Sequence, residues 1–486
     1  MPLIGFSLRP CLLVVGYMLG GLACAMLVPA LAAWWGGLEE GRVFLVSAGI
    51  TGFLAVGLVL SQRTARLGDA LSVRQALLAT SLVWTSSIAC AALPFWLSGL
   101  DYADAFFEAC SGLTTTGATI YADLDGLAGS ILLWRALLQW IGGIGIVVAA
   151  ILILPALNIG GMQLFRSESS DRSEKVLPRI QTLALAILQL YLVLSLACWL
   201  AYMLAGMGAF EALLHAMTTI STGGFSPHNR SLGYYDSPGI ELVAIGFMLL
   251  GSLPFVAWLR LRREGLSLGW RETQIPVFLC LLAAAVAAMT FSLYAQTDMD
   301  VWRALRLAGF NVTAIFTGTG YATQAFDSWG AFALTLFFLI ALFGGCAGST
   351  TGGIKIFRVQ MLAQFAWQRL RLVLAPSAVA PLRYAGRPLE DEIALSALAF
   401  VFSFIGAFML LALFLNWQGL DALTAWSGAL AALSNVGPGL GPVIGPSGHY
   451  AGLGESVKWA LAFAMLLGRL ELFTLLVLFS PRFWRV

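Results

Sequence analysis

Ser111-Gly112-Leu113-Thr114-Thr115-Thr116-Gly117-Ala118-Thr119 is a stretch whose variants return three more times in this chain of 486 residues. The returns are Ile-Ser-Thr-Gly-Gly-Phe at 220–225, Thr-Gly-Thr-Gly-Tyr-Ala-Thr at 317–323 and Ser-Asn-Val-Gly-Pro-Gly at 434–439. Aligned on one glycine, the four copies place Gly117, Gly223, Gly320 and Gly437 at intervals of 106, 97 and 117 residues. This period is too long for a solenoid repeat, and it suits two membrane helices joined by a loop.

The composition is that of an integral membrane protein. Hydrophobic residues make up 59% of the chain and charged residues 11%, with a mean hydropathy of +0.86, which is more apolar surface than one soluble core can bury. Apolar runs of roughly 20 residues, the length of a helix that crosses the hydrocarbon core, recur along the chain. We predict ten spans, at about 11–34, 43–60, 75–98, 128–156, 181–205, 239–261, 273–296, 328–346 continuing with a break to 365, 392–416 and 456–480.

The placement of basic residues sets the predicted orientation. One side of the membrane receives 20 of the 27 lysines and arginines, so we assign that side, with both termini, to the cytoplasm. These are Arg9, Arg63, Arg66, Arg74, Arg166, Arg172, Lys175, Arg179, Arg260, Arg262, Arg263, Arg271, Lys355, Arg358, Arg369, Arg371, Arg383, Arg387, Arg482 and Arg485. The four threonine and glycine loops then face outward, where nearby carboxylates are expected to attract cations. The carboxylates are Asp101, Asp104, Glu108, Asp123, Asp125, Asp298, Asp300 and Asp421.

The first two predicted spans form a hairpin without a threonine and glycine loop, so we treat residues 1–70 as an appendage to four later units. Ala30-Leu31-Ala32 resembles a signal-peptidase site, but the apolar run before it is longer than the usual stretch of about 7–15 residues. The seven cysteines lie scattered in or beside apolar runs without paired spacing, which favours buried thiols over disulfides or metal ligands.

Each of the four units has the same order: a span, a shorter apolar stretch, the threonine and glycine loop, and another span. The shorter stretches cover about 103–112, 209–220, 302–315 and 420–433. Helices of roughly 10–14 residues reach about 15–21 Å, only part of the hydrocarbon thickness, so they must enter the membrane and return. Such a path is tolerated only where the backbone is buried in protein or lines a wet cavity. We therefore expect the four loops to meet around one axis and to form the wall of a pore.

The chemistry of these loops suits a cation. Short helices that descend from outside point their partly negative C-terminal ends at the membrane centre. Glycine permits positive-φ conformations that aim successive carbonyls at one axis. A ring of carbonyl and threonine hydroxyl oxygens can then replace the hydration shell of an ion. An ordinary tight turn is the alternative for any single loop, whereas four loops, each after a half-length helix on the same face, favour ion binding.

With these residues the chain resembles the Trk/Ktr family of potassium uptake proteins, and within it the TrkH type. The resemblance covers nearly the whole length, including the extra N-terminal helix pair that TrkH-type members carry. It implies an all-α integral membrane protein with four pseudo-repeated helix/pore-loop/helix units around a central pore, plus that pair. Thr319-Gly320-Tyr321 is similar to part of the Thr-Val-Gly-Tyr-Gly filter of potassium channels, whereas the other three copies depart from it.

The predicted domains are the appendage at 1–70 and pore units at 71–170, 171–265, 266–385 and 386–486. The candidate ion-binding residues of a selectivity filter are Thr115, Thr116, Gly117, Ser221, Thr222, Gly223, Thr319, Gly320, Asn435, Val436 and Gly437. Within this set we expect potassium to bind at Thr116, Gly117, Thr222, Gly223, Thr319, Gly320, Val436 and Gly437.

A second informative stretch, Gly-Gly-Cys-Ala-Gly-Ser-Thr-Thr-Gly-Gly-Ile-Lys at 344–355, interrupts the span after the third loop. Its glycines have Walker spacing, but Ile354 occupies the lysine position and no strand precedes it, so we reject nucleotide binding. Five glycines with small polar neighbours cannot hold a straight helix, and the span should break near mid-membrane. The family resemblance implies a gating loop here, whereas a hinge without a role in permeation is the alternative. The candidate gating residues are Gly345, Gly348, Ser349, Thr350, Gly352 and Gly353.

The last predicted span carries Arg469 in an apolar sequence. A buried arginine is costly unless it is paired or faces water, and Glu471, two residues away on a helix, does not face it. Arg469 therefore either pairs with a carboxylate or freed carbonyl of another span or, as the resemblance implies, faces the pore near the glycine-rich loop, which adds it to the gating candidates. Arg135 has no such context, and we assign it no role.

The predicted function is potassium uptake across the cell inner membrane through a gated selective pore, with K⁺ as the transported ion and no bound cofactor. A proton- or sodium-coupled secondary potassium transporter is the alternative, although its usual mark is inverted repeats and the four units here are parallel. No enzyme is expected, because no cluster of histidine, cysteine or carboxylate residues recurs at depth. The resemblance implies a homodimer in the lipid bilayer and a cytoplasmic ring of nucleotide-binding regulatory subunits, for which 157–180, 354–391 and the C-terminus are the available surface. No nucleic acid partner is expected.

Overall fold

The computed structural model describes residues 7–35, 40–62, 72–152, 176–264, 273–377, 381–384, 387–389 and 391–485. Seven of the helices in these ranges are long and apolar enough to cross a membrane, which confirms a multi-pass helical membrane protein. They are α1 (Arg9–Trp35), α2 (Gly41–Ser61), α3 (Val73–Ala91) continued by α4 (Leu93–Leu97), α6 (Gly129–Leu152), α9 (Val176–Leu204), α13 (Gln274–Gln296) and α17 (Asp391–Trp417).

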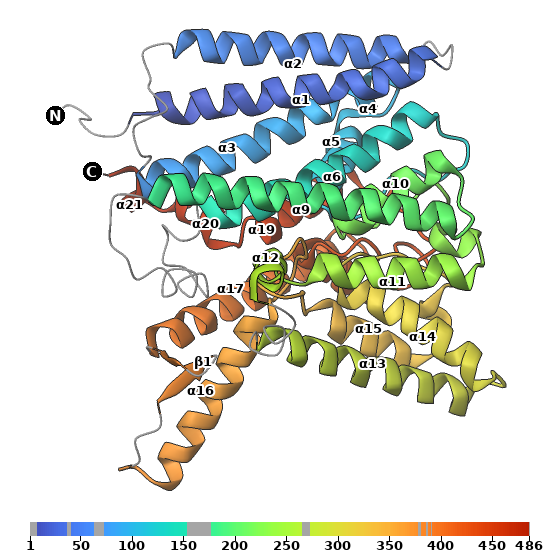
Figure 1. Cartoon of the computed structure of the whole chain (residues 1–486), viewed down its shortest axis with the longest axis vertical. Helices are drawn as coiled ribbons and strands as arrows, with labels where there is room; N and C mark the ends of the chain where they lie inside the picture. The colour runs from blue at the N-terminus through green and yellow to red at the C-terminus, as the bar shows by residue number, and fades with distance from the viewer. Residues whose placement is uncertain are drawn as a thin grey trace.

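The N-terminal hairpin forms one flank of the bundle, where α1 packs along α2 and also contacts α3 and α6 (Figure 1). The start of α1 and the C-terminal α21 (Pro481–Trp484) lie at the same end of the molecule. Two hydrogen bonds fix this arrangement: the Gln75 side chain donates to the carbonyl of Ser7 at 3.0 Å, and Arg74 donates to the carbonyl of Arg485 at 2.9 Å. Both ends of the described chain, Ser7 and Arg485, are thus on one side, as the distribution of basic residues predicts.

Four short helices precede the threonine and glycine loops: α5 (Tyr102–Leu113), α10 (Ala209–Ile220), α14 (Val301–Phe316) and α18 (Ala422–Ser434). Their bounds agree with the predicted stretches to within about two residues, the usual uncertainty of helix ends. Two of them begin at aspartate caps, since Asp300 accepts from the amides of Trp302 and Arg303, and Asp421 accepts from that of Thr424. In Figure 1, α5, α10 and α14 occupy the half of the bundle away from the termini.

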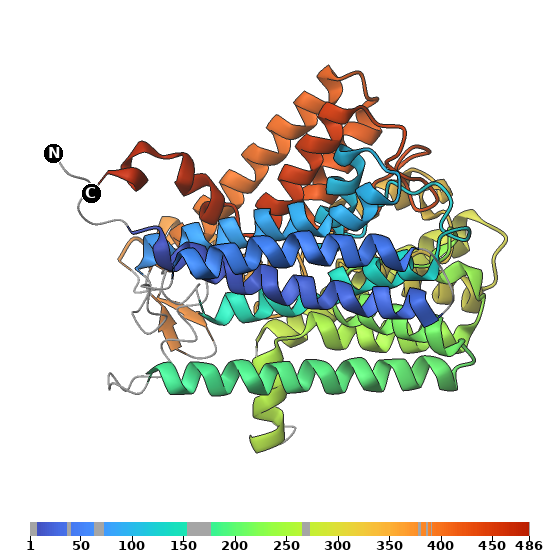
Figure 2. The same cartoon turned by 90° about the horizontal axis from the view of Figure 1, so that it is seen from above.

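Two spans that the sequence predicts as continuous are broken. Residues 239–261 form α11 (Pro238–Ser252) and α12 (Phe255–Glu264), separated by Leu253 and Pro254, because proline cannot donate the helical hydrogen bond. Figure 2 shows α12 running across the direction of the bundle. The last span bends by 107° between α19 (Glu455–Arg469) and α20 (Phe473–Leu476) with η4 (Val477–Phe479). At this bend Glu471 and Leu472 have φ of +57° and +35°, which a helix does not contain.

The glycine-rich stretch interrupts its span, as the sequence predicts. Helix α15 (Ala331–Ala341) ends before it, and α16 (Ile356–Leu374) begins after it and projects from the bundle (Figure 1). An isolated bridge between Phe343 and Ile354 brings the two ends of the stretch together. A short hairpin of β1 (Leu382–Tyr384) and β2 (Arg387–Leu389) follows, with Arg383 opposite Pro388.

The remaining described elements are the short helices η1 (Ser231–Tyr234) and η3 (Phe326–Ser328), both in connections that follow a threonine and glycine loop. The predicted unit boundaries at residues 70, 170, 265 and 385 lie outside the described residues. The division into four units therefore stays a prediction.

Candidate functional site

The four threonine and glycine loops touch one another in a closed ring. A side-chain carbon added to Gly117 would overlap a carbonyl oxygen of the second loop, and one added to Gly224 would overlap the carbonyl oxygen of Thr319 in the third. A carbon on Gly320 would lie 3.1 Å from the amide nitrogen of Gly437, and one on Gly437 would lie 2.7 Å from the carbonyl carbon of the first-loop glycine. Each loop thus contacts the next in chain order, and the fourth contacts the first.

The backbone conformation corrects the alignment of the second loop. Just after each short helix one residue has a left-handed φ: Thr115 at 52°, Thr222 at 51°, Gly318 at 74° and Asn435 at 54°. Two residues further on stand Gly117, Gly224, Gly320 and Gly437, the first three with φ of 91°, 78° and 79°. The glycine equivalent to the other three is therefore Gly224, and the alignment on Gly223 is wrong. Adjacent glycines gave the sequence no means of choosing, because only the φ angle distinguishes them.

Side chains from neighbouring segments hold the loops from behind. Gln139 of α6 donates to the carbonyl of Gly223 at 2.7 Å and accepts from the amide of Phe225 at 3.0 Å, so it clamps the second loop on both sides. The hydroxyl of Tyr450 donates to the carbonyl of Gly437 at 3.1 Å. The sequence does not single out either residue, since neither lies in a motif.

The predicted threonine ligands already have hydrogen-bond partners. The hydroxyl of Thr116 lies 2.7 Å from that of Thr114, and the hydroxyl of Thr319 lies 2.8 Å from that of Thr317. The hydroxyl of Thr222 donates to the carbonyl of Ser221 at 2.8 Å. In the fourth loop, Asn435 donates to the Thr116 hydroxyl at 3.0 Å and to the carbonyl of Met465 at 2.8 Å. These polar side chains stiffen the loops and connect the fourth loop to the first.

Arg135, to which the sequence assigned no role, joins the first loop to the second. Its Nε donates to Glu108 at 2.7 Å, and Nη1 donates to the carbonyl of Ser226 at 3.0 Å. The guanidinium also lies over the ring of Phe225, 4.0 Å from its centroid. Both charged side chains are buried, and a buried charge without its partner would be strongly unfavourable. In the sequence this ion pair is visible only as an acidic residue before the loop at 111–119 and a basic residue after it.

Other ion pairs connect short helices to the helices beside them. Arg306 of α14 bonds to Glu241 of α11 at 2.8 Å, and Lys458 of α19 bonds to Asp104 of α5 at 2.5 Å. Asp104 and Glu108 were expected to attract cations from outside, but their charges are balanced within the protein. Asp300 and Asp421, which had the same expected role, cap helices.

The glycine-rich loop presses on the inner side of this ring. The hydroxyl of Thr350 lies 3.1 Å from that of Thr222 and donates to the carbonyls of Gly251 and Ile220 at 3.1 and 3.3 Å. A side-chain carbon on Gly352 would overlap the carbonyl oxygen of Ser434 at the end of α18. The loop therefore sits directly against the ends of the second and fourth short helices, and it has no space there for a larger residue.

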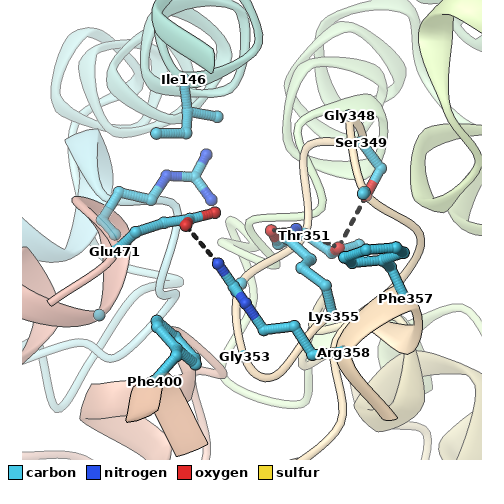
Figure 3. A pocket seen from close by; sticks show the side chains of 14 residues that line it. Ile146, Gly348, Ser349, Thr351, Gly353, Lys355, Phe357, Arg358, Phe400 and Glu471 are labelled. Atoms are coloured by element: carbon cyan, nitrogen blue, oxygen red, sulfur yellow. Dashed lines mark hydrogen bonds and ion pairs between the residues drawn. The ribbon is translucent and has the colours of Figure 1, made fainter. Parts of the chain in front are cut away.

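Arg469 contacts this loop from the end of α19. It is buried, and it donates to the carbonyl of Thr350 at 2.8 Å and to that of Gly142 in α6 at 3.5 Å. Arg469 thus bonds to backbone carbonyls of other segments, one of them in the glycine-rich loop, whereas its role in gating stays a prediction. Glu471 instead bonds to Arg358 of α16 at 2.5 Å (Figure 3).

Comparison with known proteins gives the family. The model of the TrkH family, described as a cation transport protein, matches residues 44–267 and 275–486. This chain belongs to the TrkH family. It is therefore a membrane transport protein and not an enzyme.

Similar TrkH-family proteins span nearly the whole chain. The Trk system potassium uptake protein TrkI of Halomonas elongata is 40% identical over 441 residues, which cover 89% of each protein. The Trk system potassium uptake protein TrkH of Escherichia coli strain K12 is 36% identical over 97% of this chain and 98% of that protein. The crystal structure of the potassium transporter TrkH from Vibrio parahaemolyticus has a TM-score of 0.91 and 32% identity, over 99% of this chain and all of that one.

Proposed function

We propose that this protein takes up potassium across the cell inner membrane through a selective and gated pore. The observation that carries the proposal is the closed ring of four glycine loops, each at the end of a half-length helix. Such a ring supplies backbone oxygens from four sides at one level, which is what replaces the hydration shell of a potassium ion. The names of the relatives, which are potassium uptake proteins, support the choice of ion.

In this proposal the filter ligands are backbone carbonyls, and the threonine hydroxyls position them. The hydroxyls of Thr116, Thr222 and Thr319 have protein partners within 2.8 Å, so they are less available to an ion than the sequence suggested. The filter consists of the four loops around Gly117, Gly224, Gly320 and Gly437, with Gly223 in the neighbouring position. The C-terminal ends of four helices add partial negative charge on the inner side.

The glycine-rich loop is the proposed gate. It lies against the inner face of the ring through Thr350 and Gly352, so an ion leaving the ring meets it first. Arg469 adds a fixed positive charge beside Thr350, and a positive charge on the pathway raises the energy of a passing cation. The other candidate gating residues, Gly345, Gly348, Ser349 and Gly353, belong to the same loop.

We further propose that the chain forms a homodimer and carries a cytoplasmic ring of nucleotide-binding regulatory subunits. Helix α16 and the hairpin of β1 and β2 supply part of the surface for these partners, since α16 projects from the bundle. Its outer part exposes Trp367, Leu370, Val373 and Leu374, apolar side chains that suit lipid or a second protein surface.

Two measurements test the proposed pore and gate. Expression in cells that lack potassium uptake should restore growth at low potassium, and purified protein in liposomes should pass rubidium in preference to sodium. Deletion of residues 347–352, or Arg469→Ala, should raise the flux while the rubidium-to-sodium ratio stays unchanged. Lower flux in both well-folded variants would show that the loop and the arginine support the pathway rather than obstruct it, and would refute the gate.

A further inference from the structure

A cavity of about 50 Å³ lies beneath the glycine-rich loop, between that loop, α16 and α19 (Figure 3). A buried water requires about 10–15 Å³ by this kind of measure, so the cavity has room for more than one small group. Its lining contains three cationic side chains, Lys355, Arg358 and Arg469, and one carboxylate, Glu471. With all three cationic side chains protonated, the described lining carries a net charge of two positive units.

The partners of the three cations leave this charge uncompensated. Lys355 donates to the carbonyl and hydroxyl of Thr351, and Arg469 donates to backbone carbonyls, which are neutral acceptors. Arg358 alone has an anionic partner, Glu471, and lies over the ring of Phe400 at 3.7 Å. A net positive charge enclosed by protein is unfavourable unless an anion or water reaches it.

Two buried guanidinium nitrogens, the Nε atoms of Arg358 and Arg469, have no hydrogen-bond partner among the described residues. Arg358 and Arg469 are each 2% exposed, and the Nε of each forms no hydrogen bond with any described residue. Guanidinium groups usually satisfy their donors when buried. The same two arginines thus contribute to the positive charge of the cavity lining and also retain charged donors without a partner.

Backbone amides with partial positive charge also border this cavity. Helix α16 begins at Ile356, directly after Lys355, so the partly positive N-terminal end of a 19-residue helix opens at the cavity. Among described residues, the amides of Gly352 and Gly353 in the loop donate no hydrogen bond to a protein acceptor. Consecutive free amides beside a helix N-terminus are a known setting for anions.

We propose that this cavity binds one small inorganic anion, of the chloride or phosphate class, held between Lys355, Arg358 and Arg469. A bound anion cancels part of the net charge and accepts hydrogen bonds from the cationic groups that line the cavity. Because these residues come from the loop end, from α16 and from α19, the anion also ties the loop to both helices. Binding follows from the cavity alone, whereas its effect on transport, a change in flux through the loop that it ties, rests on the proposed gate.

Thermal stability of the full-length protein in nanodiscs tests binding without measuring transport. Potassium gluconate, whose anion is too large for the cavity, is replaced by potassium chloride or by potassium phosphate at constant potassium and constant ionic strength. We expect a saturable rise in melting temperature with at least one of the two, and the anion that saturates at lower concentration is the ligand. The absence of a saturable rise with either anion would overturn the proposal.

Three variants separate binding from general damage. Lys355→Gln with Arg358→Gln should weaken the apparent affinity by about tenfold or more, since charge-assisted hydrogen bonds are lost. Arg369→Gln, on the exposed part of α16 and paired with Asp391, is the matched control and should bind as the wild type does.

Glu471→Gln has the opposite sign, because it raises the net charge of the cavity and should tighten binding even where the protein itself becomes less stable. Unchanged affinity in the double variant, or weaker binding in Glu471→Gln, would refute the site. Retained binding without any change in flux would instead refute only the proposed effect of the anion on transport.

Discussion

The corrected alignment of the second loop makes a prediction about two adjacent glycines. Gly224→Ala should disrupt the filter loop whatever the neighbouring side chains are. The effect of Gly223→Ala should instead depend on the side chain of Gln139. Gly224 has a φ of +78°, and a side-chain carbon there would overlap the backbone carbonyl of Thr319. Gly223 has no left-handed φ, and the three atoms nearest to its added carbon all belong to the end of the Gln139 side chain.

The magnitudes follow from these two obstacles. An L-residue in the left-handed region costs about 1–2 kcal/mol, and overpacking against fixed backbone costs about 1–3 kcal/mol, so Gly224→Ala should destabilise by about 2–5 kcal/mol. Gln139→Ala leaves the carbonyl of Gly223 and the amide of Phe225 without a partner, at about 1–3 kcal/mol each. Once that side chain is gone, Gly223→Ala should add little, which gives a coupling energy of about 0.5–3 kcal/mol.

Thermal denaturation of the single and double variants, with rubidium and sodium flux in liposomes, measures both effects. Rubidium preference should fall in Gly224→Ala with or without Gln139→Ala. Gly246→Ala, in α11 with open space around the added carbon, is the control and should not destabilise. If Gln139→Ala relieved Gly224→Ala as well as it relieves Gly223→Ala, the backbone register described here would be wrong.

Two further predictions rest on single contacts, and a third rests on the predicted topology. Arg135→Gln and Glu108→Gln should each lower the free energy of unfolding by about 3–5 kcal/mol, because each leaves a buried charge alone, and the double variant should cost less than the sum in denaturation experiments. Thr350→Val removes the hydrogen bonds to the second short helix and to α11, so liposome flux should rise, and lower flux would contradict the gate. A cysteine at Asp123 should react with an impermeant thiol reagent from the outside only, and labelling from the cytoplasmic side alone would invert the topology.

The short helices could be predicted from the sequence because the length of their apolar runs identifies them. A run of about 12 apolar residues between longer runs cannot cross the membrane, so its path follows from the thickness of the bilayer. The glycine-rich break was predictable for a similar reason, since glycine disfavours a helix whatever surrounds it. The choice between Gly223 and Gly224 was not, because both residues permit the required φ and the local sequence does not show which one adopts it.

The break after Arg469 shows what the sequence could not supply. No glycine or proline stands between Arg469 and Phe473, so local propensity favours a continuous helix. The structure turns instead at Glu471, whose carboxylate is held by Arg358 from a helix more than one hundred residues earlier. Arg135 was missed for the same reason, since its partner Glu108 belongs to another helix. Ion pairs between distant segments are set by tertiary structure and leave no periodic pattern.

The contacts that hold the ring differ in kind from those that hold the glycine-rich loop. Around the ring, buried or half-buried ion pairs join neighbouring helices, as in Arg135 with Glu108 and Lys458 with Asp104. Separating such a buried pair costs about 3–5 kcal/mol, because each charge is left without its partner.

Against the ring, the loop is held mainly by hydrogen bonds between neutral groups, such as those of Thr350, at a net of about 0.5–1.5 kcal/mol each. The loop should therefore move before the ring does when a partner subunit pulls on α16. The same order is expected when an anion leaves the cavity. Movement of the loop would then change the flux without a loss of ion selectivity at the ring. This requires that variants of the loop change the flux alone, and that variants of the ring change the ion preference.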